Sequence, residues 1–189
     1  MQLQTYDDIS NLDFVTMDKE EAIEVLMTEY GEEIKRLIFT YTKNWAQADD
    51  LTQEVFLTIY LKLNQYTGKS TIRTWIYSIA INKCKDFKKS WYFRNIQIVD
   101  KLVSFAKTDT KTPEMETVQK DDKSFLMEQV MSLPINYREV ILLFYYKEFT
   151  IDEIATITGL NKATIKTRLK RAREKLHTIY VGKRGESVE

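Results

Sequence analysis

An acidic segment near residue 50 carries groups that could bind a metal ion, a basic partner or only water. The segment ADDLTQEVFL spans residues 48–57 and holds three carboxylates and one amide without a basic residue. Carboxylate oxygens are ligands for hard cations, and charged side chains on a helix surface are commonly solvated. In a docking surface, they would instead accept charge-assisted hydrogen bonds from basic side chains of another protein.

Helical geometry divides the side chains of this segment between two faces. At about 100° per residue, the apolar side is formed by Leu51, Val55, Ile59 and Leu63. The opposite side holds the candidate docking residues within about 100° of arc, and these are Asp50, Gln53, Glu54 and Leu57. Asp49 points away from them. A metal site would require more acids or histidines aimed at one point, and a solvated edge would not need an exposed leucine at its centre. The pattern favours a docking surface.

A basic candidate site lies near the C-terminus, in the segment FTIDEIATITGLNKATIKTRLKRAREKL (149–176). Thr150 is placed to cap a short helix, Gly159 gives the backbone freedom for a tight turn, and Asn161 is placed to cap a second helix. The second helix has an apolar side, predicted from Ile165, Leu169, Ala172, Leu176 and Ile179. Its other faces carry the candidate DNA-binding residues Lys162, Thr164, Lys166, Thr167, Arg168, Lys170, Arg171 and Arg173. The arrangement is typical of a helix-turn-helix that reads the major groove, although an ordinary amphipathic helix with solvated lysines is the simpler alternative.

A second basic helix is predicted in the middle of the chain, at residues 71–92. Its predicted apolar side contains Ile72, Ile76, Ile79, Ala80 and Phe87, and its other face mixes Thr74, Ile81 and polar residues with lysines. Apolar or aromatic groups among lysines suit unpaired bases, which need a stacking surface as well as positive charge. The candidate DNA-binding residues of this helix are Arg73, Ser78, Asn82, Lys85 and Lys89.

Helical spacing of apolar residues extends through most of the 189 residues, and the chain has only five glycines and two prolines. Helices are predicted at 18–43, 47–64, 71–92, 122–132, 135–147, 151–158 and 162–180. A polar break with Pro113 separates the two groups. The predicted fold is all-α, with two small helical domains joined by a flexible linker. The predicted boundaries are an extension at 1–16, domains at 17–95 and 122–182, and a linker at 96–121.

Composition excludes several classes of function. The single cysteine, Cys84, excludes an internal disulfide framework or a cysteine metal cluster and suits a reducing cytoplasm. One histidine, His177, makes histidine-dependent catalysis improbable. No apolar run approaches the roughly 20 residues needed to cross a bilayer, and the acidic N-terminus does not resemble a signal peptide. We therefore expect a cytoplasmic protein with no membrane insertion of its own, no catalytic residues, no metal and no cofactor.

The zero net charge conceals a strong segregation along the chain. Residues 1–60 hold thirteen acidic and four basic residues, whereas residues 69–94 hold seven basic residues and one acid. Residues 161–184 hold nine basic residues and one acid. This distribution predicts one surface for a basic partner and two surfaces for a polyanion.

These segments together resemble a known family. LPINYREVILLFYYKEFTIDEIATITGLNKATIKTRLKRAREKL (133–176) resembles the C-terminal domain of bacterial extracytoplasmic-function (ECF) sigma factors. ADDLTQEVFLTIYLKL with STIRTWIYSIAINKCKDF (48–87) resembles their N-terminal domain. The resemblance covers roughly residues 20–180, in the same order. It implies a subunit of RNA polymerase that recognises promoters and has no enzymatic chemistry of its own.

The resemblance also implies roles for individual residues. Asp50, Gln53 and Glu54 match the stretch that docks on the clamp helices of the polymerase β′ subunit. The loop Tyr66–Thr71, with Asn82 and Lys85, matches the part that reads the promoter −10 element as a single strand. The resemblance therefore adds Tyr66, Lys69 and Thr71 of this loop to the candidate DNA-binding residues. Lys166, Thr167, Lys170 and Arg171 match positions that read the −35 element. Ser78, Lys83, Cys84 and Lys170 occupy places where relatives differ, so the resemblance does not define the preferred promoter sequence.

The expected partners are core RNA polymerase (its β′ clamp helices and β flap), promoter DNA and an anti-sigma factor. The main alternative is a conventional helix-turn-helix regulator that binds duplex DNA without polymerase, but it leaves the second basic surface without a purpose. A decoy that binds only a sigma antagonist would not need the basic residues of both surfaces. An enzyme is a third alternative, but neither clustered His or Cys residues nor a GxxxxGK loop accompanies the acids.

Overall fold

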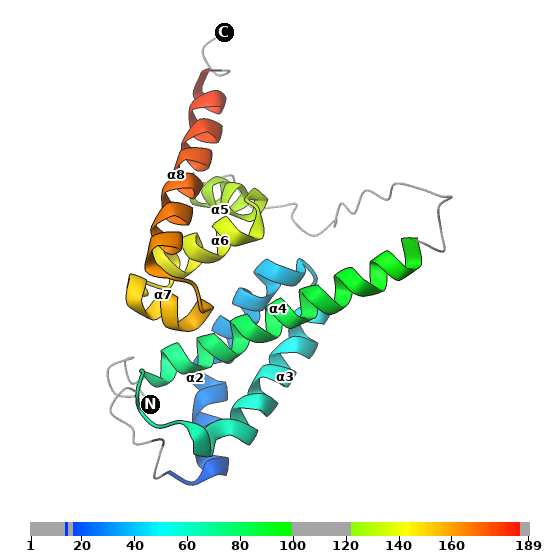
Figure 1. Cartoon of the computed structure of the whole chain (residues 1–189), viewed down its shortest axis with the longest axis vertical. Helices are drawn as coiled ribbons and strands as arrows, with labels where there is room; N and C mark the ends of the chain where they lie inside the picture. Colours follow the sequence, from blue (N-terminus) through cyan, green and yellow to red (C-terminus); the bar gives the residue numbers. More distant parts are fainter. Residues whose placement is uncertain (1–13, 15–16, 100–121, 186–189) are drawn as a thin grey trace. The chain divides into compact units, whose positions relative to one another are not determined.

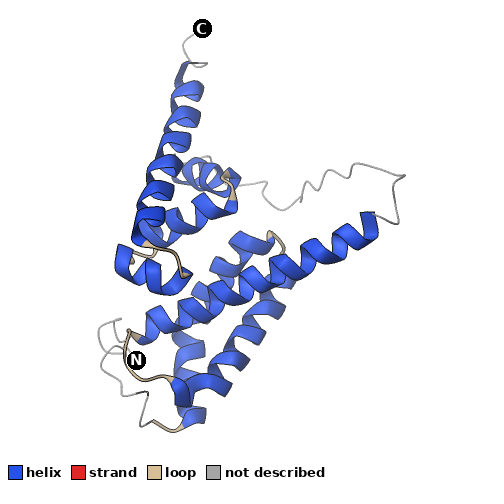
Figure 2. Cartoon of the chain, in the orientation of Figure 1, coloured by secondary structure: helices blue, strands red, loops and turns tan. Residues whose placement is uncertain are grey.

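A computed structural model of the chain describes residues 14, 17–99 and 122–185, and all regular elements in these ranges are helices (Figure 2). The predicted all-α class is thereby confirmed. The predicted extension at 1–16, apart from the buried Phe14, lies outside the described residues, as do positions 100–121 of the predicted linker.

Three long helices form the N-terminal part of the fold: α2 (Lys19–Thr42), α3 (Trp45–Lys62) and α4 (Ile72–Val99). A short 3₁₀ turn, η1 (Leu63–Gln65), follows α3 (Figure 1). Their side chains provide the largest group of buried apolar residues, including Leu26, Ile34, Val55, Ile59 and Ile76. Each helix therefore contributes an apolar stripe to one core.

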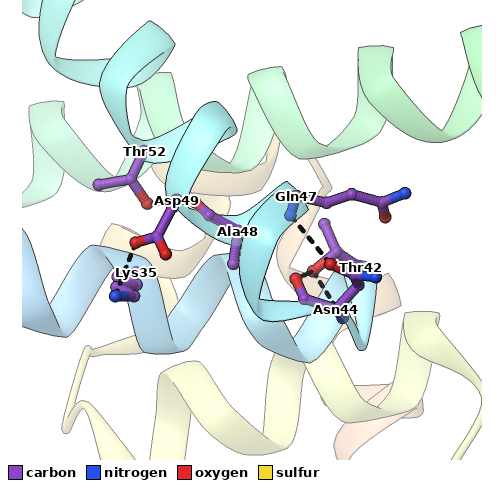
Figure 3. Close-up of polar contacts among 7 residues, drawn as sticks. All are labelled: Lys35, Thr42, Asn44, Gln47, Ala48, Asp49 and Thr52. Atoms are coloured by element: carbon purple, nitrogen blue, oxygen red, sulfur yellow. Dashed lines mark hydrogen bonds and ion pairs between the residues drawn. The ribbon is translucent and has the colours of Figure 1, made fainter.

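Local side-chain caps fix the ends of α2 and α3. The Asp18 carboxylate accepts hydrogen bonds from the backbone N–H groups of Glu20 (3.0 Å) and Glu21 (3.5 Å) at the start of α2. The helix ends at Lys43, which adopts a left-handed conformation (φ 53°). Asn44 then caps α3 by accepting a hydrogen bond from the backbone N–H of Gln47 (3.0 Å; Figure 3). Lys43 and Asn44 are consecutive residues and form the whole connection, so α2 and α3 make a tight helical hairpin.

The buried face of α4 differs from the prediction. Ile72, Ile76, Ile79 and Ala80 are buried as expected, but Thr74, Tyr77, Ile81 and Cys84 are buried as well. The buried arc is therefore wider than the single stripe predicted by the helical wheel, and it is displaced toward Tyr77. The reason is that α4 contacts α2 through Tyr77 and Glu33 and contacts α3 through Lys83 and Glu54. A helix with two neighbours buries more of its circumference than a helix with one.

A partly buried polar cluster joins α4 to α2, and only Tyr77 in it is fully buried. The Tyr77 hydroxyl donates a hydrogen bond to Oε1 of Glu33, and Nη2 of Arg73 lies 3.3 Å from the same oxygen. Burial, and secondly the Glu33 carboxylate, raise the pKa of Tyr77 well above its ordinary value. The cluster satisfies a carboxylate that would otherwise be costly to bury.

The C-terminal part contains shorter helices: α5 (Asp122–Ser132), α6 (Ile135–Ile141), α7 (Ile151–Thr158) and α8 (Lys162–Gly185). A π-helical turn, η3 (Leu142–Tyr146), follows α6 directly, and the backbone N–H of Lys147 bonds to the carbonyl of Leu142 (3.0 Å). The sequence predicted one continuous helix at 135–147, so the π turn is a difference from the prediction. The tyrosines Tyr145 and Tyr146 at its end are both exposed.

The chain forms two compact units. One contains α2, α3, α4 as far as Lys88, and the segment Phe149–Lys162 with α7. The other contains α5, α6 and η3 together with α8 from Ala163 onward. Among the described residues, no helix is long and apolar enough to traverse a lipid bilayer.

The predicted helix ranges agree closely with the observed ones, with two exceptions besides the π turn. Helix α4 continues to Val99, so residues 96–99 of the predicted linker are helical. Helix α8 continues to Gly185, five residues beyond the predicted end. The extension of α8 has the sequence VGKRG, in which apolar periodicity is weak, whereas the extension of α4, FRNIQIV, mixes apolar and polar residues.

Candidate functional site

The exposed side of α3 carries the predicted docking residues. Asp50, Gln53, Glu54 and Leu57 are all exposed, whereas Leu51, Val55 and Ile59 on the other side are buried. Leu57 has 59% of its surface exposed. The helix therefore presents two carboxylates, one amide and one leucine on a single surface, available to a partner.

Asp49 is oriented away from this surface. Its Oδ1 atom lies 2.6 Å from Nζ of Lys35 on α2, and this hydrogen bond raises the pKa of Lys35 (Figure 3). Asp49 thus connects the two helices of the hairpin, which makes it a natural control for its neighbour Asp50. Asp49 and Asp50 point in different directions because consecutive residues of a helix are rotated by about 100° about its axis.

Glu54 contacts α4 as well as solvent. Its Oε2 atom lies 3.4 Å from Nζ of Lys83, and both side chains are substantially exposed. An exposed pair at this distance contributes little to stability, so a basic group of a partner could displace Lys83 at small cost. Within the described residues, no group of three or more His, Cys, Asp or Glu is arranged to hold a metal ion.

The loop that precedes α4 is held by its own side chains. The Tyr66 hydroxyl donates to the carbonyl of Ser70 (2.8 Å), and its ring lies 5.3 Å from the ring of Trp75. Gly68 has a φ of 71°, a left-handed conformation that suits glycine. Thr71 begins the helix, because its Oγ1 accepts from the backbone N–H of Thr74 (3.2 Å). The loop is therefore preformed, and Lys69 and Thr71 are exposed on it.

The predicted −10 residues of α4 differ in their exposure and in the protein contacts that are described for them. Asn82 and Lys89 are exposed. Ser78 is half-buried, and its hydroxyl bonds to the carbonyl of Trp75 (2.7 Å). Arg73 is paired with Glu33, and within the same compact unit Nζ of Lys85 donates to the carbonyl of Thr158 (2.8 Å). Arg73 and Lys85 would have to exchange a protein contact for one with DNA.

The sequence signals for the helix-turn-helix have clear structural counterparts. Thr150 and Glu153 form a reciprocal capping box at the start of α7. Gly159 ends α7 in a left-handed conformation with a φ of 72°. Asn161 immediately precedes α8. The Lys162 ammonium forms an ion pair with the Asp152 carboxylate across the turn.

Helix α8 exposes most of the predicted −35 residues. Lys162, Lys166, Thr167, Lys170, Arg171 and Arg173 are exposed, and Thr164 is half-buried. Ile165, Leu169 and Ala172 are buried on the other side, but Leu176 is only half-buried and Ile179 is 36% exposed. The predicted apolar stripe therefore ends about two turns earlier than expected, because the helix extends beyond the core.

Arg168 differs from the other predicted −35 residues. Its Nη1 atom lies 3.8 Å from Oε2 of Glu139 on α6, and Glu139 is only 5% exposed. The neighbouring Arg138 is also buried, and its Nη1 donates to the carbonyl of Met131 (3.0 Å). The position of Arg168 fits a role in holding α8 against α6. This pairing was not predictable from helical spacing, because the two residues are 29 positions apart and lie on different helices.

Sequence reasoning missed one exposed residue on α3. Leu61 follows Leu57 by four positions and has 63% of its surface exposed. The helical spacing could have identified it, since residues at i and i+4 share a face.

Comparison with known proteins gives a consistent assignment. A model of sigma-70 region 2 matches residues 26–91, and a model of sigma-70 region 4 matches residues 126–176. Together they span more than half of the chain. The region 2 match contains α3 and its acidic surface, and the region 4 match contains α7 and the basic part of α8 as far as Leu176.

Curated relatives and solved structures agree with these matches. The chain is 29% identical over 159 residues to the ECF RNA polymerase sigma factor SigM of Bacillus subtilis, covering 84% of this chain and 94% of the relative. It is 28% identical over 164 residues to the ECF sigma factor SigW of the same organism, covering 83% and 88%. Its fold is similar to that of the sigma factor RpoE of Bartonella quintana, solved with the anti-sigma factor NepR (TM-score 0.62, 22% identity, covering 86% and 95%). Matches to both regions in one chain, at nearly full length, show that it belongs to the sigma-70 family and is a sigma factor of the ECF type.

Proposed function

We propose that this chain binds core RNA polymerase and directs it to promoters that it recognises at the −35 and −10 elements, where it also assists DNA melting. The observation that carries the proposal is the combination of surfaces in one chain of this family. An acidic surface on α3 suits a basic partner, and two basic surfaces suit DNA. We assign residues 17–95 to region 2 and residues 122–182 to region 4.

The docking step uses the exposed side of α3. Asp50 and Glu54 would accept hydrogen bonds from basic side chains of the β′ clamp helices, and Gln53 would bond to polar groups beside them. Hydrogen bonds to charged groups contribute roughly 1.5–3 kcal/mol each, so two or three are enough for a specific contact. The β flap is the corresponding partner of region 4.

Recognition of the −10 element would use the loop at 66–71 and the exposed residues of α4. The loop is preformed, so it loses little entropy when it receives a base. An extruded base costs a few kcal/mol of unstacking, which hydrogen bonds from Asn82 and phosphate contacts from Lys69 and Lys89 would offset. The mixture of polar and basic groups suits single-stranded DNA.

Recognition of the −35 element would use the N-terminal half of α8. Lys166, Thr167, Lys170 and Arg171 are exposed on one side of a helix of suitable length for the major groove. Lys162, Thr164 and Arg173 would contact the flanking phosphates. Phosphate contacts fix the register of the helix, and base contacts provide the sequence preference.

The alternative of a conventional helix-turn-helix regulator is not favoured, because both parts of the chain match sigma-70 regions. Sigma factors are not catalytic enzymes, and we infer that this chain has no enzymatic activity of its own. We also infer that it acts in the bacterial cytoplasm, where core polymerase and promoters are found.

An anti-sigma factor is a further proposed partner. Two structural neighbours were solved as complexes, CnrH with the cytosolic domain of CnrY and RpoE with the anti-sigma factor NepR. A chain with comparable surfaces would be inhibited by a protein that covers them. Affinity purification from cells in which the target promoters are silent should recover such a protein, and recovery of polymerase alone would count against it.

Run-off transcription with core polymerase tests the proposed function directly. Wild-type protein should support initiation from a subset of a promoter library, whereas Glu54→Lys should abolish it by reversing a charge at the docking surface. Asn82→Ala should allow a closed complex but reduce melting. Asp49→Ala is the matched control, because Asp49 contacts Lys35 and should have little effect. Normal transcription with a folded Glu54→Lys protein would exclude this docking surface.

A further inference from the structure

The exposed side of α3 extends one helical turn beyond the proposed docking residues. Leu57 and Leu61 have 59% and 63% of their surfaces exposed, the two highest values among the large apolar residues described as exposed. They are four positions apart and share one stripe of the helix. One exposed leucine is ordinary on a protein surface, but two on one stripe beside a charged group form an apolar patch that needs an explanation.

Leu61 is not required to complete the core at this end of α3. Ile59 and Leu63 are already buried there. Tyr60, on another side of the helix, donates a hydrogen bond to Oε1 of Glu20 (2.8 Å), and Nζ of Lys19 lies 4.3 Å from its ring centre. The contacts of α3 with its neighbours are therefore made by other residues, and Leu61 faces solvent.

The stripe has two chemically distinct halves. Asp50, Gln53 and Glu54 form a polar, acidic half, and Leu57 and Leu61 form an apolar half further along the axis. At 1.5 Å per residue, the distance along the axis from Asp50 to Leu61 is about 16 Å. A complementary partner must present basic groups at one end of its contact and apolar side chains about two turns away.

We propose that Leu61 is an additional anchor of the polymerase-docking surface and that this surface is bipartite, with an acidic half that binds basic side chains and an apolar half that buries Leu57 and Leu61. This inference rests on the proposed function. It adds a chemical requirement for the partner, because the stems of arginines alone would not bury a second leucine. Aliphatic or aromatic side chains of core polymerase must cover Leu61.

A second copy of the chain is a poor match for the same stripe. If two copies paired in parallel, acidic halves would face acidic halves, and like charges would repel. If they paired antiparallel, the carboxylates of one copy would face the leucines of the other and would lose solvation without gaining partners. The charge pattern therefore requires a different, basic and apolar partner.

The two halves should respond differently to salt. Interactions between charges weaken when the Debye length falls from about 10 Å at 0.1 M to about 3 Å at 1 M salt, whereas burial of a leucine does not depend on screening. Apolar burial also gives binding a negative heat-capacity change. These two signatures separate a true apolar anchor from a residue that only lies near the acidic half.

The experiment measures binding of full-length chain variants to core polymerase at low and high salt. Leu61→Gln should weaken binding about tenfold or more, the range expected for loss of a buried leucine, and by the same factor at both salt concentrations. Asp50→Asn should weaken binding by a factor that shrinks as salt rises. Lys62→Gln is the matched control, since it introduces the same residue about 100° away on the helix, and it should change binding by no more than about twofold. Leu61→Met should bind nearly as well as wild type.

Each other outcome has a defined meaning. Unchanged binding by Leu61→Gln, together with loss of binding by Glu54→Lys, would overturn the bipartite surface and leave the proposed function intact. Unchanged polymerase binding by both variants would show that this side of α3 does not bind polymerase. If the Leu61→Gln effect declined with salt as the Asp50→Asn effect does, the apolar half would not be a separate contact. If Leu61→Gln changed only the sedimentation mass of the free chain, the stripe would be a self-association surface.

Discussion

At the scale of single residues, the ionisable groups of this protein divide between binding surfaces and the core. Glu33, Tyr77 and Arg73 form a partly buried cluster that links α2 to α4. Glu139 and Arg168 link α6 to α8. Both pairings join residues that are far apart in the sequence, so residue type alone did not distinguish Arg73 and Arg168 from arginines available to DNA.

Tyr77 gives this cluster a measurable pH dependence. Tyr77→Phe should destabilise the protein by roughly 1.5 kcal/mol at neutral pH, since it removes a hydrogen bond to a carboxylate. The pKa of Tyr77 is raised in the folded state, so its contribution is fully present below the unfolded value of about 10. It is lost as pH rises above that value, by up to about 1.4 kcal/mol per pH unit.

Urea unfolding of wild type and Tyr77→Phe between neutral and alkaline pH tests this prediction. The difference in the free energy of unfolding should be constant below about pH 10 and should shrink above it. Because the other tyrosines are present in both proteins, their titration cancels in the difference. A difference that did not change with pH would contradict the assignment of the Tyr77 proton.

Lys166 and Arg168 should behave differently although both are basic residues of α8. Lys166→Ala should relax sequence preference at one −35 position, at a cost of roughly 1–3 kcal/mol for the preferred base. Arg168→Ala should instead lower the stability of the C-terminal part, because it removes the ion-pair partner of the buried Glu139. It should leave the base preference unchanged.

Selection of −35 sequences with each variant, combined with thermal unfolding, distinguishes the two roles. An unaltered sequence preference with Lys166→Ala would exclude Lys166 as a base-reading residue. A stable Arg168→Ala protein with altered preference would show that the Glu139 contact is incidental.

At the scale of secondary structure, the sequence predicted the helices well where local signals define their ends. Asp18 caps α2, and Thr150 with Glu153 caps α7, and such caps depend only on neighbouring residues. The width of the buried arc of α4 was not predictable in the same way. Burial of Thr74 and Ile81 depends on packing against more than one element, which a single helical wheel does not include.

The π turn at Leu142–Tyr146 and the exposure of Leu61 illustrate two further limits. A π turn retains helical spacing on average, so apolar periodicity cannot reveal it. A leucine in the sequence does not reveal whether its side chain is exposed or buried in the fold. Only the positions of the neighbouring helices decide this. The acidic residues of α3 could be selected from the sequence because their charge and spacing are unusual together.

Glycines test the backbone conformation of the helix-turn-helix. Gly159 has a left-handed φ of 72°, and a Cβ atom there would meet nothing within 4 Å. Gly159→Ala should therefore destabilise the protein by roughly 1–2 kcal/mol through backbone strain alone, with a smaller loss for Gly159→Asn.

Gly31 lies inside α2 and also has open space around it. Gly31→Ala should stabilise the protein by roughly 0.5–1 kcal/mol.

Chemical unfolding of the two alanine variants provides the comparison, with opposite signs expected for the same substitution. A neutral or stabilising effect of Gly159→Ala would mean that the turn can adopt another conformation.

At the scale of the whole molecule, equal numbers of acidic and basic residues give a net charge of zero at pH 7. The acidic N-terminal third and the two basic segments therefore compensate each other in long-range electrostatics. A neutral protein attracts DNA weakly from a distance. Arg73 also forms an ion pair with Glu33, and Lys85 donates to the carbonyl of Thr158, so both would have to give up a protein contact before they could bind DNA.

These features predict low DNA affinity for the free chain and high affinity for its complex with core polymerase. In the complex, about 6–10 phosphate contacts by Lys and Arg would give a steep salt dependence, with a slope near −0.9 per neutralised phosphate for duplex DNA. Fluorescence anisotropy of labelled promoter DNA, with and without core polymerase, measures both quantities. Glu54→Lys in the presence of polymerase should show only the weak binding of the free chain, since the charge reversal separates the two proteins. Tight and sequence-specific binding by the free chain at physiological salt would contradict the prediction, because the basic surfaces would then need no polymerase to act.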